Sequence, residues 1–167
     1  MRADRRTRRA RRAPTARAGP GRPGGRRFGT LVHSVLATVP LDAAAEDVRA
    51  IAEVQARLIS APTGEADAAA VLAADVLAHQ LLAAARQASE RGSCLREVPV
   101  SIVRDGVLID GQADLAFEEK SGWVVVDFKT DGEFTLGEAN YRRQVALYAE
   151  AITRATGRPA RGVLLRV

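Results

Sequence analysis

Three short apolar stretches, separated by two turn signals, limit the folds that this chain can adopt. The first covers residues 97–103 and the second residues 107–117, with Asp105-Gly106, a strong hairpin signal, between them. Residues 120–122, Lys-Ser-Gly, predict a second turn. Residues 123–127 then form a continuous apolar run of the kind found at the centre of a sheet. The pattern predicts three consecutive strands that begin with an antiparallel hairpin.

Helical periodicity surrounds these strands. Apolar residues recur at helical spacing over residues 30–39, about 43–59, about 67–90 and about 137–156, and residues 161–167 then predict a last strand. We therefore predict an α/β fold with a helical N-terminal part, a mixed central sheet containing an antiparallel hairpin, one helical crossover and flanking helices. Gly111, inside the second strand, indicates a bulge or a close backbone approach.

Positive charge is concentrated at the N-terminus. Residues 1–28 contain eleven arginines and one acid, whereas residues 29–167 contain fourteen Lys and Arg against nineteen Asp and Glu. The Arg/Pro/Gly-rich composition predicts a disordered basic tail or linker over residues 1–28, followed by one folded domain over residues 29–167. The tail either binds nucleic acid by neutralising phosphates, or is a linker or a misplaced translation start, and composition does not separate these alternatives.

The chain has a single cysteine, Cys94, which excludes an internal disulfide, a four-cysteine zinc site and a four-cysteine iron–sulfur cluster within it. We therefore expect a protein of the reducing cytoplasm. No secretory signal is visible. The most apolar stretch, residues 68–85, is interrupted by Asp75, His79 and Gln80 and predicts a buried amphipathic helix, not a membrane span.

Two acids and a lysine carry the candidate chemistry. Asp114 lies on the second predicted strand and Asp127 at the end of the third, so a hairpin that turns near residues 120–121 brings their strands within about 5 Å. Two facing carboxylates repel each other unless a cation lies between them, and Mg²⁺ accepts that arrangement. Lys129, two residues after Asp127, points to the same side of an extended chain. Alternatively, Asp127 caps the strand end and Lys129 is a solvated charge.

The residues around this trio form five short motifs with a characteristic order and spacing. They are Gly29-Thr-Leu-Val-His33, Glu97-Val-Pro99, Gly111-Gln-Ala-Asp114, Asp127-Phe-Lys129-Thr-Asp131 and Gln144-Val-Ala-Leu-Tyr148. Together they resemble the PD-(D/E)XK nuclease superfamily, and within it the C-terminal nuclease domains of RecB- and AddA-type helicase–nucleases. The resemblance covers residues 29–167 and implies a restriction-endonuclease-like core.

The resemblance also implies a Mg²⁺ ion, with Mn²⁺ as a substitute, and a role for each matching residue. Asp114 and Asp127 would bind the metal, the backbone carbonyl of Phe128 would complete its ligands, and Lys129 would be the catalytic lysine. His33 would be a further metal ligand or a phosphate contact. The family also uses Gln144 and Tyr148, four residues apart on one helical face, to support the active site and contact DNA.

Several of these residues have simpler explanations. A histidine on a helix, such as His33, is more often structural than a ligand, and Gln144 with Tyr148 would also make an ordinary helix surface pair. Glu97 either reaches the metal or is an edge-strand charge. Arg142 and Arg143 are the best candidates for phosphate contacts in the acidic body, or they belong to a solvated helix face.

The leading hypothesis is a Mg²⁺-dependent deoxyribonuclease, an exonuclease acting on DNA ends or single strands in DNA repair and recombination. The alternative is a catalytically idle DNA-binding or partner-docking module with a basic tail. A restriction-type endonuclease ranks low, since no extra recognition domain is visible. No phosphate-binding G-x-x-x-x-G-K-[ST] loop is found, so we expect a small stand-alone nuclease or the last piece of a helicase–nuclease. DNA is the expected partner, together with a helicase subunit or a fused helicase region.

Overall fold

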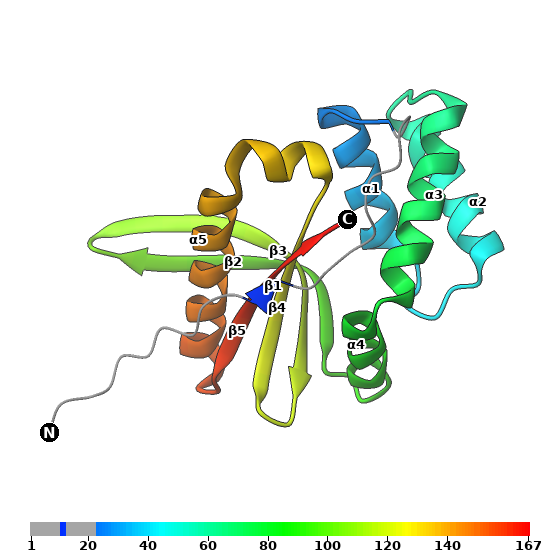
Figure 1. The fold of residues 1–167 in the computed structure, drawn as a ribbon. Helices are drawn as coiled ribbons and strands as arrows, with labels where there is room; N and C mark the ends of the chain where they lie inside the picture. Colours follow the sequence, from blue (N-terminus) through cyan, green and yellow to red (C-terminus); the bar gives the residue numbers. More distant parts are fainter. Residues whose placement is uncertain (1–10, 13–22) are drawn as a thin grey trace, which may run out of the picture.

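The computed structural model describes residues 11–12 and 23–167, without the side chains of residues 11–12 and 131–136, and from residue 26 onward it confirms the predicted order of helices, three strands, one helix and a last strand. A two-residue strand at residues 11–12, within the predicted tail, precedes the helical part. The other strands follow, with one long helix before the last of them (Figure 1). The helices are α1 (Arg26–Thr38), α2 (Ala45–Leu58), α3 (Thr63–Ala78), α4 (Gln80–Glu90) and α5 (Asp131–Thr156), and the strands are β1 (Arg11–Arg12), β2 (Cys94–Arg104), β3 (Val107–Glu119), β4 (Gly122–Lys129) and β5 (Ala160–Arg166).

The strands form one mixed sheet in the order β1-β5-β4-β3-β2. The consecutive strands β2, β3 and β4 are antiparallel, whereas β4 and β5 run parallel and are joined by α5. The apolar strand β4 therefore lies at the centre, as predicted. At the first turn both Asp105 (φ 52) and Gly106 (φ 78) have positive φ, which is the geometry of a tight hairpin turn that matches strand twist.

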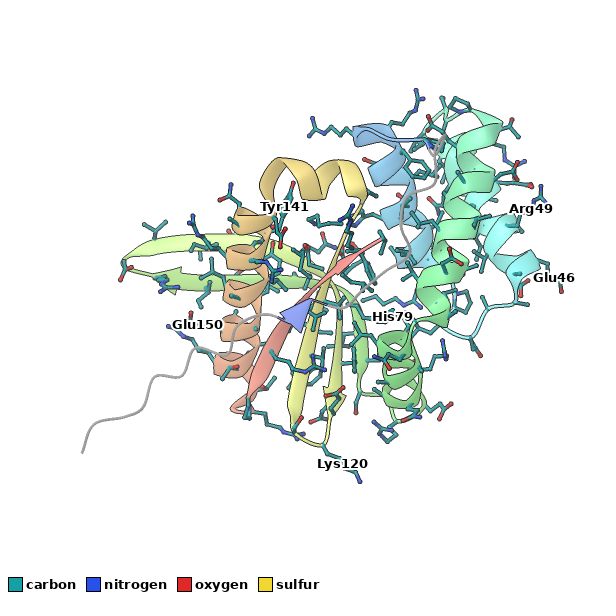
Figure 2. All side chains as sticks on the ribbon, in the orientation of Figure 1. Glu46, Arg49, His79, Lys120, Tyr141 and Glu150 are labelled. Carbon is teal, nitrogen blue, oxygen red and sulfur yellow. The ribbon has the colours of Figure 1, made fainter. Side chains whose placement is uncertain are left out.

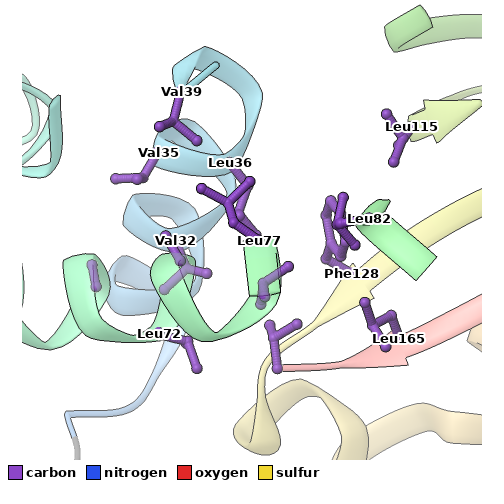
Figure 3. Packing of buried hydrophobic residues seen from close by; sticks show 14 of the residues in the cluster. Val32, Val35, Leu36, Val39, Leu72, Leu77, Leu82, Leu115, Phe128 and Leu165 are labelled. Carbon is purple, nitrogen blue, oxygen red and sulfur yellow. The ribbon is translucent and has the colours of Figure 1, made fainter. Parts of the chain in front are cut away.

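Helices cover both faces of the sheet (Figure 1). On one face α1, α3 and α4 pack against alternate residues of the central strands, and Figure 3 shows Phe128 and Leu165 among the buried side chains of this larger core. On the other face α5 contributes Val145, Tyr148 and Ile152 to a second, smaller core. Successive side chains of β4 point to opposite faces of the sheet, which is why β4 contributes to both cores: Val124 and Val126 lie in the larger core and Val125 in the smaller one.

The β2–β3 ribbon changes the face that it presents halfway along its length. Leu115 packs in the larger core, but Ala113, two residues earlier, packs in the smaller one. Pairing continues across the change, from Arg96↔Leu115 to Val98↔Ala113. Glu97, between these two rungs, has a left-handed φ of 48°. The ribbon therefore turns over at Glu97 and Asp114, and its outer half passes over α5 (Figure 1).

The helix predicted over residues 67–90 is wrong as a single helix. It is two helices, α3 and α4, which meet at His79 with a 73° bend. His79 is extended (φ −66, ψ 141), and its Nδ1 accepts a hydrogen bond of 3.1 Å from the amide of Leu81, so it caps α4. Within residues 23–167 no single helix has the length and hydropathy to cross a membrane, and α3 with α4 reach them only when taken together across the bend.

The two ends of the helical pattern also differ from the prediction. Helix α1 begins at Arg26, and Phe28, on the tail side of the predicted boundary, is buried in the larger core. Most of the predicted tail, residues 1–10 and 13–22, lies outside the described residues. Helix α5 begins at Asp131 and not at Gly137, which is a non-helical kink (φ −167, ψ 29) within it.

Candidate active site

The strand register places Asp114 and Asp127 next to each other. The β3–β4 ladder ends with Leu115 paired to Val126, so the next residue on each strand is one of the two acids. Asp127 also continues into the β4–β5 ladder, where it pairs with Leu164. Both carboxylates therefore lie at the point where β3 leaves the central strand, as the two-turn pattern predicted.

The carboxylate of Asp114 connects three segments of the chain. Its Oδ2 accepts a 2.6 Å hydrogen bond from the amide of Phe128. This side-chain bond links β3 to β4 just beyond the last backbone pair of their ladder, Leu115↔Val126. Its Oδ1 lies 3.1 Å from Nδ1 of His33. Helix α1, which carries His33, is anchored to β2 by Arg96, whose guanidinium donates to the carbonyls of Leu36, Ala37 and Val39 at the helix end. His33 therefore lies beside a predicted metal-binding carboxylate, and its own role as a metal ligand or phosphate contact stays a prediction.

Asp127 is almost completely enclosed, with 3% of its surface exposed. Burial raises the pKa of Asp127 from 3.8 to about 6; Lys129 opposes this rise, and Asp114 adds to it. An enclosed carboxylate with a second acid beside it favours a bound cation. The chain itself supplies one in Lys129.

Lys129 lies in the same enclosed region and is 8% exposed. Its ammonium is 2.9 Å from Oδ2 of Asp127 and donates a 3.1 Å hydrogen bond to the carbonyl oxygen of Phe128. These are two of the oxygens that the resemblance assigns to the metal. The side chains of Asp127 and Lys129 share one side of β4, as their two-residue spacing predicted.

Glu97 lies on β2 across from Asp114, since both occupy the position between the same two rungs of the ribbon. Partial desolvation raises the pKa of Glu97, and the nearby Asp114 raises it further. Its Oε2 accepts a 2.8 Å hydrogen bond from Gln112. Three acids on three adjacent strands thus form a row. Because Glu97 is exposed on an edge strand, the geometry supports both roles considered for it.

Gln144 and Tyr148 form a hydrogen-bonded pair on α5. Nε2 of Gln144 lies 2.6 Å from the hydroxyl oxygen of Tyr148, which is 3% exposed. The tyrosine crosses directly under Gly111 of β3, where a Cβ atom would overlap its ring and hydroxyl. This confirms the close backbone approach suggested for Gly111, and the continuous ladder there excludes the bulge. The pair is therefore fixed under the ribbon that carries Asp114.

The two arginines predicted for phosphate contacts differ. Arg142 is half-buried and pairs with Glu138, one turn earlier on α5, at 2.7 Å. Arg143 is exposed. Nearer the acids, a surface cleft of about 430 Å³ is lined by one side of α1, including Arg26, Thr30 and His33, and by Glu97. The cleft therefore adjoins the row of acids, because it is lined by Glu97 and by His33, which contacts Asp114.

Tyr141 is a neighbour of the site that the sequence analysis missed. The ammonium of Lys129 lies over its ring, 4.9 Å from the ring centre. Figure 2 shows Tyr141 near the bend of α5. The available signal was its spacing, three residues before Gln144 and seven before Tyr148, which puts all three on one helical face.

The donor atoms fit Mg²⁺ better than a metal that needs a complete set of protein ligands. Among the described side chains, no group of three or more His, Cys, Asp or Glu residues is arranged to hold a metal ion. Asp114, Asp127 and the Phe128 carbonyl offer a few oxygens on one side. Mg²⁺ keeps several waters and takes few protein oxygens, so this set suits it, whereas structural zinc needs four ligands.

The fold and the cluster define a class of protein: an α/β nuclease with a restriction-endonuclease-like core, built on a strand hairpin, a buried acid pair and a lysine. A profile of the PD-(D/E)XK nuclease superfamily matches residues 5–167, and the chain belongs to that superfamily. An ATP-dependent helicase/nuclease subunit from Alkaliphilus oremlandii (strain OhILAs) is 37% identical over 67 residues. The match covers 38% of this chain and 6% of that protein, and it confirms the resemblance to helicase–nucleases.

Proposed function

We propose that the chain is a Mg²⁺-dependent deoxyribonuclease that hydrolyses phosphodiester bonds at DNA ends or in single strands. The observation that carries this proposal is the contact of Lys129 with Asp127 and the Phe128 carbonyl, beside Asp114. An acid pair, a backbone oxygen and an ammonium in one enclosed place match what phosphodiester hydrolysis requires.

Asp114, Asp127 and the Phe128 carbonyl would hold the metal, which when bound polarises the phosphate and lowers the pKa of water. The ammonium of Lys129 orients the attacking water or stabilises the negative charge that develops on the phosphate. His33, 3.1 Å from Asp114, holds that carboxylate from the α1 side and faces the cleft through which a strand would arrive. Tyr148, which is buried, supports the ribbon from below, and its partner Gln144, which is half-buried, is the member of the pair that contacts DNA in this proposal.

The wider setting is proposed from the relative and from composition. The similarity to a helicase/nuclease subunit supports action in DNA repair and recombination together with a helicase, as a separate polypeptide or a fused region. The single cysteine, half-buried and free, suits a reducing cytoplasm, where we place the activity.

A cleavage assay tests the proposal. Wild-type protein should degrade linear and single-stranded DNA with Mg²⁺ or Mn²⁺, and not with EDTA. Asp114→Asn, Asp127→Asn and Lys129→Met should each lower the rate at least a hundredfold while circular dichroism shows a folded protein. Closed circular duplex should resist cleavage if the enzyme needs ends. Full activity of Asp127→Asn or Lys129→Met would refute the assignment.

The arginine-rich N-terminal region supports a second candidate, a DNA-binding module that does not cleave. That function requires steeply salt-dependent binding without metal-dependent hydrolysis. The two candidates separate in the same assay, because only the nuclease converts bound DNA to shorter products when Mg²⁺ is added.

A further inference from the structure

Three polar side chains of α5 face the sheet from one side of the helix. Tyr141, Gln144 and Tyr148 occupy positions i, i+3 and i+7, which share a helical face. Gln144 and Tyr148 bond to each other, and Tyr148 packs under Gly111. Tyr141 makes a different contact, with Lys129, and the nuclease mechanism described above leaves it without a role.

The geometry of this contact is that of a cation–π interaction. The Lys129 ammonium lies 4.9 Å from the centre of the Tyr141 ring, inside the distance of about 6 Å over which the ring face attracts a cation. Lys129 is buried, which strengthens such an attraction because little water competes for the charge. The Gly137 kink lies near the same ring, since a Cβ added there would come within 3.4 Å of its Cε2.

The other contacts described for the ammonium are with oxygens that a metal would also use. Asp127 Oδ2 and the Phe128 carbonyl hold Lys129 in this structure, and both belong to the proposed metal ligands. Lysine has a flexible four-carbon stem and loses its place readily when its partners change. A Mg²⁺ ion would bind the carboxylates and not the face of the Tyr141 ring. The contact between Tyr141 and Lys129 would therefore persist when the metal takes the oxygens.

We propose that Tyr141 is a positioning residue that keeps the ammonium of Lys129 beside the acid pair through the face of its ring. This inference rests on the proposed nuclease function and adds a residue to it. The ring, and not the hydroxyl, carries the role. Phenylalanine at position 141 should therefore preserve the contact with Lys129, and an aliphatic side chain should abolish it.

The first test compares Tyr141→Phe with Tyr141→Leu in full-length protein. Tyr141→Phe should keep kcat within about twofold of wild type, and Tyr141→Leu should lower kcat roughly tenfold with little change in KM, as expected for loss of a partly desolvated cation–π contact. Leu147→Ala, on the same helix, controls for a general disturbance of α5 and should cleave at the wild-type rate. Equal activity of Tyr141→Leu and wild type, or equal loss in Tyr141→Phe and Tyr141→Leu, would overturn the proposal.

The second test does not depend on cleavage. Metal-free protein is treated with a limiting amine-acylating reagent, and modification of Lys129 is followed by peptide mass spectrometry, with exposed Lys120 as an internal reference. Lys129 should react several-fold faster in Tyr141→Leu than in wild type or Tyr141→Phe, and unchanged reactivity contradicts the contact. If wild type does not cleave DNA, the nuclease proposal fails while this measurement still decides the role of Tyr141. If Tyr141→Leu does not fold, Tyr141→Met replaces it in both tests.

Discussion

Asp127 combines deep burial with a strongly raised pKa, and this gives the metal-free protein a defined pH dependence. Its pKa is about 6 in the folded protein against 3.8 for the unperturbed group. The folded state therefore binds the proton more tightly than the unfolded state. The contribution of Asp127 to stability is therefore greatest below about pH 4 and is lost as pH rises through 6, by about 1–3 kcal/mol in total.

Asp127→Asn should remove this dependence, because asparagine resembles the protonated acid at every pH. In urea unfolding with EDTA, the variant should match wild type near pH 4 and exceed it by about 1–3 kcal/mol at pH 7. Added Mg²⁺ should stabilise wild type and leave Asp127→Asn unchanged. Parallel curves for the two proteins between pH 4 and 7 would show that Asp127 is not the group responsible.

Lys129 and the proposed metal share two oxygens, and this sharing makes a second prediction. Lys129→Met keeps most of the side-chain volume and removes the competing charge, so Mn²⁺ should bind several-fold more tightly by calorimetric titration. Cleavage should nevertheless fall at least a hundredfold, since the ammonium is lost. Lys120→Met, in the exposed turn between β3 and β4, is the matched control and should change neither quantity. Weaker Mn²⁺ binding by Lys129→Met would contradict the shared oxygens.

At the residue scale, local spacing predicted some neighbours and not others. Asp114 and Asp127 could be paired from sequence, because one tight turn fixes the register of two adjacent strands. The contact between Lys129 and Tyr141 could not, since it depends on where α5 docks after a kink at Gly137. The position of Glu97 opposite Asp114 was equally hidden, because the ribbon turns over at that rung through a positive φ that the residue type does not signal.

Between elements, α5 approaches the β2–β3 ribbon closely at Gly111. A Cβ at this position would overlap the hydroxyl and ring of Tyr148, whose own place is fixed by Gln144 and the smaller core. Gly111→Ala should therefore destabilise the protein by about 1–3 kcal/mol, as overpacking of a filled core does. It should also lower cleavage, because the ribbon carries Asp114.

Gly64→Ala is the matched control for that substitution. Gly64 lies in α3, where an added methyl group would meet no atom within 4 Å, and alanine favours helix. Urea unfolding should show no loss of stability for Gly64→Ala and a clear loss for Gly111→Ala. Equal stabilities of the two variants would mean that the ribbon moves away from Tyr148 without cost.

The strands were more predictable than the helix ends for a physical reason. Turn signals at residues 105–106 and 120–122 require particular backbone angles, and the structure has them. The break between α3 and α4 has no such signal, because the sequence around His79 contains neither Gly nor Pro. It arises instead where His79 caps the next helix and Arg86 donates to the carbonyl of Leu77 at the end of α3.

For the whole molecule, the separation of charge along the chain bears most on how DNA is reached. Residues 29–167 carry nineteen acids against fourteen Lys and Arg, and three of those acids form the row at the candidate site. A body with this balance repels phosphate at long range. The eleven arginines of residues 1–28 supply the opposite field, although they are separate in sequence from the acid–acid–lysine cluster.

Binding and chemistry should therefore separate when the N-terminal charge is removed. Replacing Arg2, Arg5, Arg6, Arg8 and Arg9 by glutamine should weaken DNA binding and reduce the slope of log affinity against log salt by up to about 4, because each phosphate contact contributes about 0.9. The value of kcat at saturating DNA should stay the same, since Asp114, Asp127 and Lys129 are unchanged.

Fluorescence anisotropy at several salt concentrations measures the slope. The control is Arg57→Gln, at an exposed arginine of α2, which shows the effect of removing one charge outside this segment. An unchanged slope would mean that the body binds DNA through local arginines alone, and a lower kcat would place the N-terminal segment at the reacting phosphate.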